Sequence, residues 1–121
     1  MTLEHLGAGL IDLVPELAAF VPPGEVIDKW VYSPWMNNTL ADCLERRGSD
    51  TIVVTGGETD VCVLATVLGA IDRGYRVIVA SDAICSSADE THDASLRLYH
   101  DRYGQQVDIA TTAQILSCWD A

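Results

Sequence analysis

The sequence predicts an α/β fold in which helices cover both faces of a parallel β-sheet. Two segments, Thr51–Thr55 (TIVVT) and Arg76–Ser81 (RVIVAS), have apolar centres and lack the alternation of polar residues that marks a half-exposed strand. Helical patterns follow both segments after short connections, as is typical of parallel sheets. Active sites of such sheets lie beyond the carboxyl ends of the strands, where we expect Ser33, Gly56–Cys62 and Asp82–Ser87.

The amino-terminal part predicts a helix, a strand and a second helix. Apolar residues within Leu10–Leu17 follow helical spacing, and Pro15 is tolerated only near the start of such a helix. A Pro-Pro-Gly sequence then breaks the chain. After this break we expect a strand over Glu25–Tyr32 and a helix over Thr39–Arg47.

The rest of the chain predicts alternating helices and strands. The helical pattern after Thr51–Thr55 is apolar on nearly all sides, so we expect that helix to lie deep in the fold. Gly74 suits the position after its last turn, because glycine accepts the left-handed backbone found there. In order, the expected elements are helix Asp60–Arg73, strand Arg76–Ser81, helix Asp89–Tyr103, strand Val107–Ala110 and helix Thr111–Trp119.

Length and charge restrict the classes of protein that the chain can represent. With 121 residues, 49% of them hydrophobic, it predicts a single domain over residues 1–121. A net charge of −11 repels phosphate backbones, so we expect no nucleic acid partner, and no attraction to anionic membranes. No apolar run is long enough to cross a membrane, and the amino terminus lacks the basic start of a signal peptide. We therefore expect a cytoplasmic protein with reduced cysteines.

The connection from Gly56 to Cys62 carries the strongest signal for chemistry. Its two glycines allow a tight backbone, and Thr59 or Asp60 suits the cap of the following helix. Cys62 then falls in the first helical turn, where free N–H groups and the helix dipole favour the nucleophilic thiolate and suit an oxyanion on an attacked carbonyl. The alternative is a small buried cysteine that packs the helix against the sheet, and the local pattern alone leaves both open.

Three motifs in the sequence resemble a known family. They are Val53–Val63 (VVTGGETDVCV), Asp72–Val77 (DRGYRV) and Ser81–Ala83 (SDA). Together they resemble the isochorismatase-like cysteine hydrolases, which include nicotinamidases, N-carbamoylsarcosine amidases and ureidoacrylate amidohydrolases. The resemblance covers residues 25 to about 112 and implies a Rossmann-like three-layer α/β fold.

The resemblance implies a role for each residue of a candidate site. Cys62 would attack an amide or carbamoyl carbon of a small molecule and form a thioester, and Lys29 matches the family's catalytic lysine. The N–H groups of Glu58 and Cys62 would form the oxyanion hole, and the Gly57–Glu58 bond matches a cis peptide of the family. Without the motif, Lys29 would be interpreted as an exposed lysine near the end of an edge strand.

One member of the family's Asp–Lys–Cys triad has no counterpart in the sequence. That aspartate belongs to the family's first strand, and only 28 residues precede Lys29. Asp12 imitates the motif superficially, but its surroundings predict a helix that it would cap, and Asp28 would point to the opposite face from Lys29. We therefore expect a chain that corresponds to the carboxyl-terminal part of the fold, truncated at the amino terminus, with low or no activity.

Two other functions remain open. A non-catalytic α/β scaffold or assembly module would keep the fold without the chemistry. A thiol redox protein would need a resolving cysteine near Cys62, which the sequence does not place there. We expect His92 on a helix surface rather than paired with Cys62, and we expect no metal and no cofactor.

The substrate and the partners are predicted only in outline. Trp30, Tyr32 and Trp35 are candidates to line a pocket for a flat or apolar group, although aromatic residues of strands more often belong to the core. We expect a small-molecule substrate and, from the resemblance, a homo-oligomer.

Overall fold

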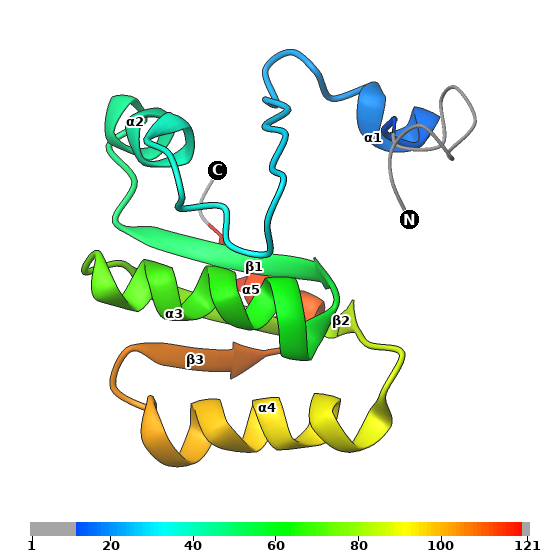
Figure 1. Cartoon of the computed structure of the whole chain (residues 1–121), viewed down its shortest axis with the longest axis vertical. Helices are drawn as coiled ribbons and strands as arrows, with labels where there is room; N and C mark the ends of the chain where they lie inside the picture. The colour runs from blue at the N-terminus through cyan, green and yellow to red at the C-terminus, as the bar shows by residue number, and fades with distance from the viewer. Residues whose placement is uncertain (1–11, 120–121) are drawn as a thin grey trace.

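The computed structural model describes residues 12–119, and a parallel sheet of three strands forms the centre of this part of the chain. Helices α3 and α4 cover one face of the sheet, and helix α5 lies on the other (Figure 1). The predicted α/β fold with helices on both faces of a parallel sheet is therefore confirmed. In the order β1-β2-β3 the strands are Thr51–Gly57, Arg76–Cys85 and Val107–Ala110, and these helices are Leu64–Asp72, Asp89–Arg102 and Thr112–Ser117.

The core lies between the sheet and helices α3 and α4. Val77 and Val79 of β2 are fully buried, as expected for a central strand with both faces covered. Val67 and Ala70 of α3 and Tyr99 of α4 belong to the same buried cluster. Each fully buried valine contributes about 1.5–3 kcal/mol relative to an exposed one, so this layer supplies much of the stability of the fold.

Strand β2 ends at Cys85, beyond the predicted end at Ser81. Its pairing with β1 is irregular, because Val54 pairs with Val79 whereas Gly56 pairs with Ile84. The apolar pattern stops at Ser81, so periodicity could not reveal that pairing resumes after the interruption. As a consequence, the carboxyl ends of β1 and β2 still finish side by side.

The helix predicted over Asp60–Arg73 has two parts. Its first turn, η2 (Thr59–Val63), is π-helical, and α3 continues from it. The N-cap residue is Glu58, and no side chain caps this start, so the predicted cap by Thr59 or Asp60 is wrong. At the other end, Gly74 has a φ of 84°, which confirms the predicted left-handed position.

The strand predicted over Glu25–Tyr32 is wrong, because the structure has irregular chain there. A strand needs a partner for its backbone groups, and this segment pairs with none of the strands within residues 12–119. Val26, Trp30 and Tyr32 are 56%, 80% and 67% exposed, so the apolar pattern is not matched by burial. In Figure 1 this segment is the coil that connects α1 to α2 outside the sheet.

Two further helices precede the sheet. Helix α1 (Pro15–Ala18) starts at the predicted proline, with Val14 and not Asp12 as its N-cap. Asp12 and Leu13 are not helical, so the predicted helix starts too early, and its residues 10 and 11 lie outside the described part. Helix α2 (Thr39–Arg46) matches its prediction to within one residue. Throughout residues 12–119, no helix has the length and apolar character that a membrane span requires.

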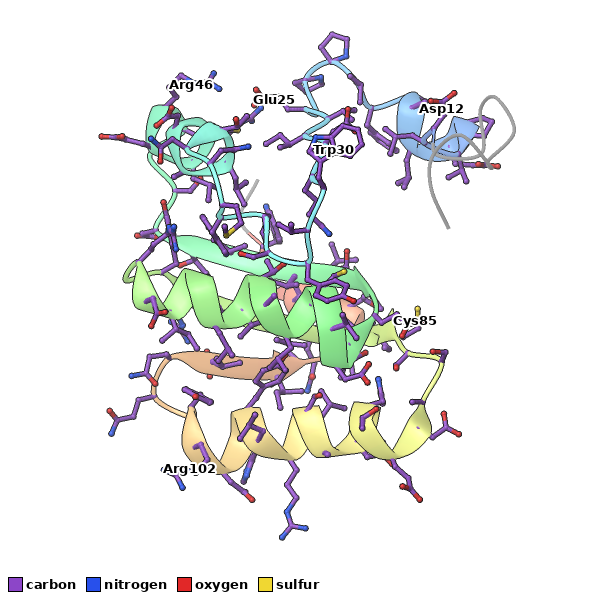
Figure 2. The ribbon with its side chains drawn as sticks, viewed as in Figure 1. Asp12, Glu25, Trp30, Arg46, Cys85 and Arg102 are labelled. Atoms are coloured by element: carbon purple, nitrogen blue, oxygen red, sulfur yellow. The ribbon has the colours of Figure 1, made fainter. Side chains whose placement is uncertain are left out.

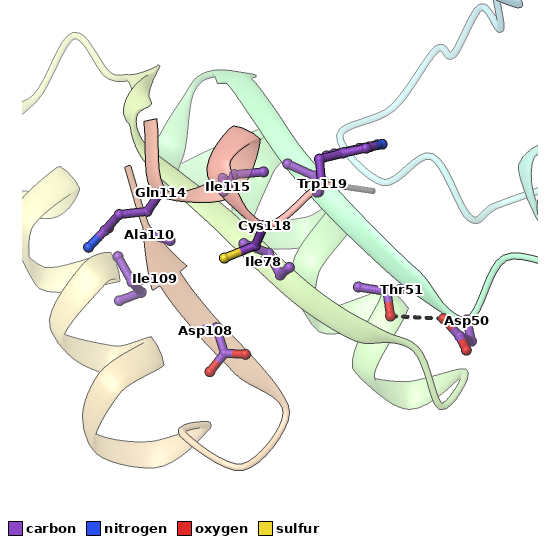
Figure 3. A pocket seen from close by; sticks show the side chains of 11 residues that line it. Asp50, Thr51, Ile78, Asp108, Ile109, Ala110, Gln114, Ile115, Cys118 and Trp119 are labelled. Atoms are coloured by element: carbon purple, nitrogen blue, oxygen red, sulfur yellow. Dashed lines mark hydrogen bonds between the residues drawn. The ribbon is translucent and has the colours of Figure 1, made fainter. Parts of the chain in front are cut away.

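A groove of about 860 Å³ lies on the face of the sheet that α5 covers in part. Ile78 and Ile109 contribute from the sheet, and Ile115, Cys118 and Trp119 contribute from α5 and the residues after it (Figure 3). The lining of this groove includes none of the residues that the sequence analysis assigns to the candidate site.

Candidate active site

Lys29 and Cys62 lie together beyond the carboxyl end of β1, although 33 positions separate them in the chain. The Lys29 ammonium Nζ lies 3.5 Å from the Cys62 sulfur Sγ and donates a hydrogen bond to it. The same ammonium donates to the carbonyl oxygen of Val31 at 3.0 Å, which keeps the ammonium near the sulfur. The structure thus brings together Cys62, the predicted nucleophile, and Lys29, the predicted catalytic lysine.

The turn that carries Cys62 begins directly after β1. Gly57 ends that strand opposite Cys85, and the Gly57–Glu58 peptide bond is cis, the geometry that the resemblance implies. A Cβ atom added to Gly57 would lie 3.1 Å from both the carbonyl oxygen and the sulfur of Cys85, so a side chain here would push the two strand ends apart. The carbonyl oxygen of Glu58 accepts the N–H groups of Val61 and Val63, which closes the turn.

Side chains at the start of this turn bond to α4 and to the loop before it. Thr59 is fully buried, and its hydroxyl lies 2.8 Å from Nδ1 of His92. The Asp60 carboxylate accepts hydrogen bonds from the hydroxyls of Ser86 and Thr91. These two bonds, the one from Ser86 first, lower the pKa of the Asp60 carboxyl, so it is ionised at neutral pH. His92 therefore pairs with Thr59, and the structure contains no dyad between His92 and the cysteine.

The segment that carries Lys29 is attached to α2 through Glu25. The carboxylate accepts hydrogen bonds from the Cys43 thiol at 2.9 Å, from Arg47 at 2.7 Å and from Arg46 at 3.3 Å. These bonds lower the pKa of Glu25 to about 2, with the thiol contact the largest cause and Arg47 the next. Figure 2 shows Glu25 and Arg46 on facing sides of the space between the segment and α2. The attachment restrains the chain shortly before Lys29.

The three aromatic candidates for substrate contact differ in their surroundings. Trp35 is 6% exposed, its ring stacks on Tyr75 with centroids 6.0 Å apart, and its indole N–H donates to the carbonyl oxygen of Thr66 at 3.0 Å. Trp35 is therefore a core residue, and the expectation that it lines a substrate pocket is corrected. Trp30, on the exposed coil in Figure 2, and Tyr32 are largely exposed, and their contact with a substrate stays a prediction.

Ser86 and Thr91 are members of the site that the sequence did not predict. Both lie far along the chain from Asp60, at separations of 26 and 31 positions. Hydroxyl residues are common near helix starts, so their type alone carries no signal for a remote partner. The available signal was positional, because the segment Asp82–Ser87 was expected at the same edge of the sheet.

The arrangement supplies a nucleophile and a cation without a neighbouring base. Among residues 12–119, no carboxylate forms an ion pair with Lys29. In the same part of the chain, no group of three His, Cys, Asp or Glu side chains is arranged to hold a metal ion. Within the described residues, the site therefore holds an ammonium beside the Cys62 sulfur, and no carboxylate pairs with that ammonium.

Comparisons with known proteins show what the chain as a whole resembles. The profile of the Isochorismatase domain matches residues 5–113. The uncharacterised isochorismatase family protein YwoC of Bacillus subtilis is 35% identical over 84% of this chain and 53% of its own length. The maleamate amidohydrolase of Pseudomonas putida is 34% identical over 75% of this chain and 46% of its own length. A nicotinamidase from Staphylococcus aureus has a similar structure, with a TM-score of 0.67 and 27% identity over 74% of this chain and 58% of that chain. The chain thus spans about half the length of these curated relatives.

Proposed function

Since the chain belongs to the isochorismatase family, we propose that its site serves cysteine-dependent hydrolysis of a C–N bond in a small amide or carbamoyl compound. The contact of 3.5 Å between Lys29 Nζ and Cys62 Sγ carries this proposal. An ammonium at that distance stabilises negative charge on the sulfur and so favours the thiolate, which is the nucleophilic form of cysteine.

The proposed reaction has two stages. The Cys62 thiolate attacks the carbonyl carbon, the C–N bond breaks, and the nitrogen leaves as ammonia or an amine after it takes up a proton. Water then cleaves the thioester, which releases the acid and restores the thiolate with loss of a proton to solvent. The N–H groups of Glu58 and Cys62 are the proposed oxyanion hole for both stages.

The names of two relatives support this class of substrate. One is a maleamate amidohydrolase and the other a nicotinamidase, so both act on an amide bond of a small molecule. The exposed Trp30 and Tyr32 are the proposed contacts for a flat or apolar group of the substrate. Cytoplasmic location and assembly of the chain into a homo-oligomer are further proposals.

A second candidate function is a non-catalytic scaffold. It is favoured by one observation, namely that Lys29 has no carboxylate partner within residues 12–119. General acid–base catalysis contributes about 10²- to 10⁴-fold in rate. A site with a thiolate and no proton-transfer group would therefore react readily with an alkylating reagent but hydrolyse a substrate slowly.

Peptide-resolved alkylation with iodoacetamide at about pH 7 tests the proposal. Cys85 and Cys118 are exposed and serve as internal references. We expect Cys62 to react about three- to tenfold faster than either reference, because only its sulfur contacts the ammonium. Equal rates at Cys62 and Cys118 would contradict an activated thiolate.

Release of ammonia from a panel of small amides separates the two candidate functions. The matched control is Cys62→Ser, which replaces the thiol by a hydroxyl of similar size that is a much weaker nucleophile. Ammonia release that depends on Cys62 supports the hydrolase, whereas fast labelling without any release supports the scaffold.

A further inference from the structure

The Asp60 carboxylate joins three segments that are remote in the chain. It lies in η2, two positions before Cys62, and it accepts the Ser86 hydroxyl from the loop after β2 at 2.6 Å. It also accepts the hydroxyl of Thr91, in the first turn of α4. Ser86 is itself fixed, because its hydroxyl oxygen accepts the N–H of Ala88 at 3.1 Å.

From this network we infer that Asp60, together with Ser86 and Thr91, positions the turn that holds Cys62 beside Lys29. The inference rests on the proposed function of Cys62 and assigns to Asp60 a positioning role, since none of its contacts involves the reacting sulfur.

The conformation of the turn calls for such an external restraint. The turn is π-helical, which is rare, and no side chain caps its start. The turn therefore lacks the side-chain cap that often fixes a helix start, and the bonds from Ser86 and Thr91 restrain it from outside instead. The partly buried bond between Thr59 and His92 also ties the residue next to Asp60 to α4.

Charge gives a second reason for the network. A carboxylate without partners near Cys62 could compete with the sulfur for the Lys29 ammonium. The two hydroxyl donors leave the Asp60 carboxylate ionised but hold its oxygens towards α4 and its preceding loop. Glu58 is the other acidic residue between β1 and Cys62, and its carboxylate likewise accepts a hydrogen bond, from the Ser87 hydroxyl at 3.0 Å.

Thr91→Val tests the inference, because valine keeps the shape of threonine and removes the hydroxyl. The readout is the iodoacetamide rate at Cys62 at about pH 7 and at about pH 9.5, where ordinary thiols are mostly ionised. We expect the rate at about pH 7 to fall by about fivefold and the rate at about pH 9.5 to change little, because the thiolate is less favoured but equally accessible. Thr91→Ser, which keeps the hydroxyl, is expected to restore the original rate.

Two controls separate positioning from general loosening. Thr51→Val removes a hydroxyl bonded to Asp50 at the opposite end of β1 and is expected to leave Cys62 unchanged. Cys43 is 7% exposed and reports opening of the fold. If Thr91→Val accelerates labelling of Cys43, or leaves Cys62 unchanged, the positioning role is overturned.

A double variant tests whether Thr91 acts through Asp60. In an Asp60→Ala background, Thr91→Val is expected to have no further effect on Cys62. An equal effect in both backgrounds would show that Thr91 acts by another route and would overturn the inference. If Cys62 of the unaltered chain reacts no faster than Cys118, the proposed function fails as well. If Cys62 reacts faster than Cys118 and Thr91→Val leaves that rate unchanged, only the positioning role is overturned.

Discussion

At the residue scale, the contact between Lys29 and Cys62 depends on one exposed side chain. The ammonium is held near the sulfur by a hydrogen bond to the Val31 carbonyl. Water and salt screen an exposed charge, so its effect on the sulfur is moderate and falls as ionic strength rises. Lys29 is also the only lysine in the sequence, which makes it easy to address chemically.

Replacement of Lys29 by methionine is therefore expected to slow the alkylation of Cys62. We expect a decrease of about three- to tenfold at about pH 7 and low salt, because the thiolate loses its neighbouring cation. The measurement is the peptide-resolved iodoacetamide rate. Arg102→Met, which removes the same charge from the exposed end of α4 (Figure 2), is the matched control. A similar decrease in both variants would mean that overall charge, and not the contact, sets the reactivity.

Trp30 and Trp35 lie five positions apart, but their replacement by alanine is expected to affect the stability of the fold to very different extents. Trp35 is 6% exposed and packs over Gly69, where an added Cβ would lie 2.2 Å from its ring. Trp35→Ala is expected to lower the free energy of unfolding by about 3–5 kcal/mol. Trp30 is 80% exposed, so Trp30→Ala is expected to change the free energy of unfolding by less than about 0.5 kcal/mol. Urea unfolding measures both, and equal losses would contradict the assignment of Trp35 to the core.

At the element scale, continuous apolar patterns predicted the structure well. Strand β1 and helix α4 match their expected positions to within two residues, because each carries its own local signal. The expected strand over Glu25–Tyr32 failed because strand formation depends on a remote partner, which a local pattern does not contain.

The residues of the candidate site likewise fall into those that the sequence predicted and those that it did not. Cys62 and Lys29 were identified because a motif with specific spacing carries them. Ser86 and Thr91 were not, since their contacts with Asp60 depend on how α4 packs beside η2. The π-helical form of η2 was also missed, because an apolar helical pattern is the same for both helix types over one turn.

The attachment of the Lys29 segment to α2 is expected to weaken in acid. The pKa of Glu25 is lowered from its ordinary value of 4.5 to about 2 by bonds from Cys43, Arg47 and Arg46. A carboxylate with a lowered pKa stabilises the folded form fully above its unfolded value, and this contribution is lost as the pH falls through the folded value. The attachment should thus be complete above about pH 4.5 and fade towards about pH 2.

Carbon-13 NMR of the Glu25 carboxyl group checks this pH dependence. Titration at the ordinary value in the unaltered chain would contradict the expectation. In Arg47→Gln the Glu25 carboxyl should titrate at higher pH than in the unaltered chain, because one of the stabilising bonds is removed.

At the scale of the whole molecule, the net charge of −11 opposes the compact state. Added salt shortens the range of this repulsion, with a screening length of about 30 Å at 10 mM and about 8 Å at 150 mM. We expect Tm to rise by a few degrees between these concentrations of sodium chloride. Thermal unfolding followed by circular dichroism measures the change, and a Tm that falls with salt would show that attractive ion pairs outweigh repulsion.

Strand β1 borders only β2 among the strands within residues 12–119, so one side of it is open. An open strand edge is a template on which a strand from another molecule can add. At low ionic strength, mutual repulsion between acidic molecules keeps such edges apart. We therefore expect the salt that raises Tm also to shorten the time before a concentrated sample aggregates, so purification has to balance thermal stability against solubility.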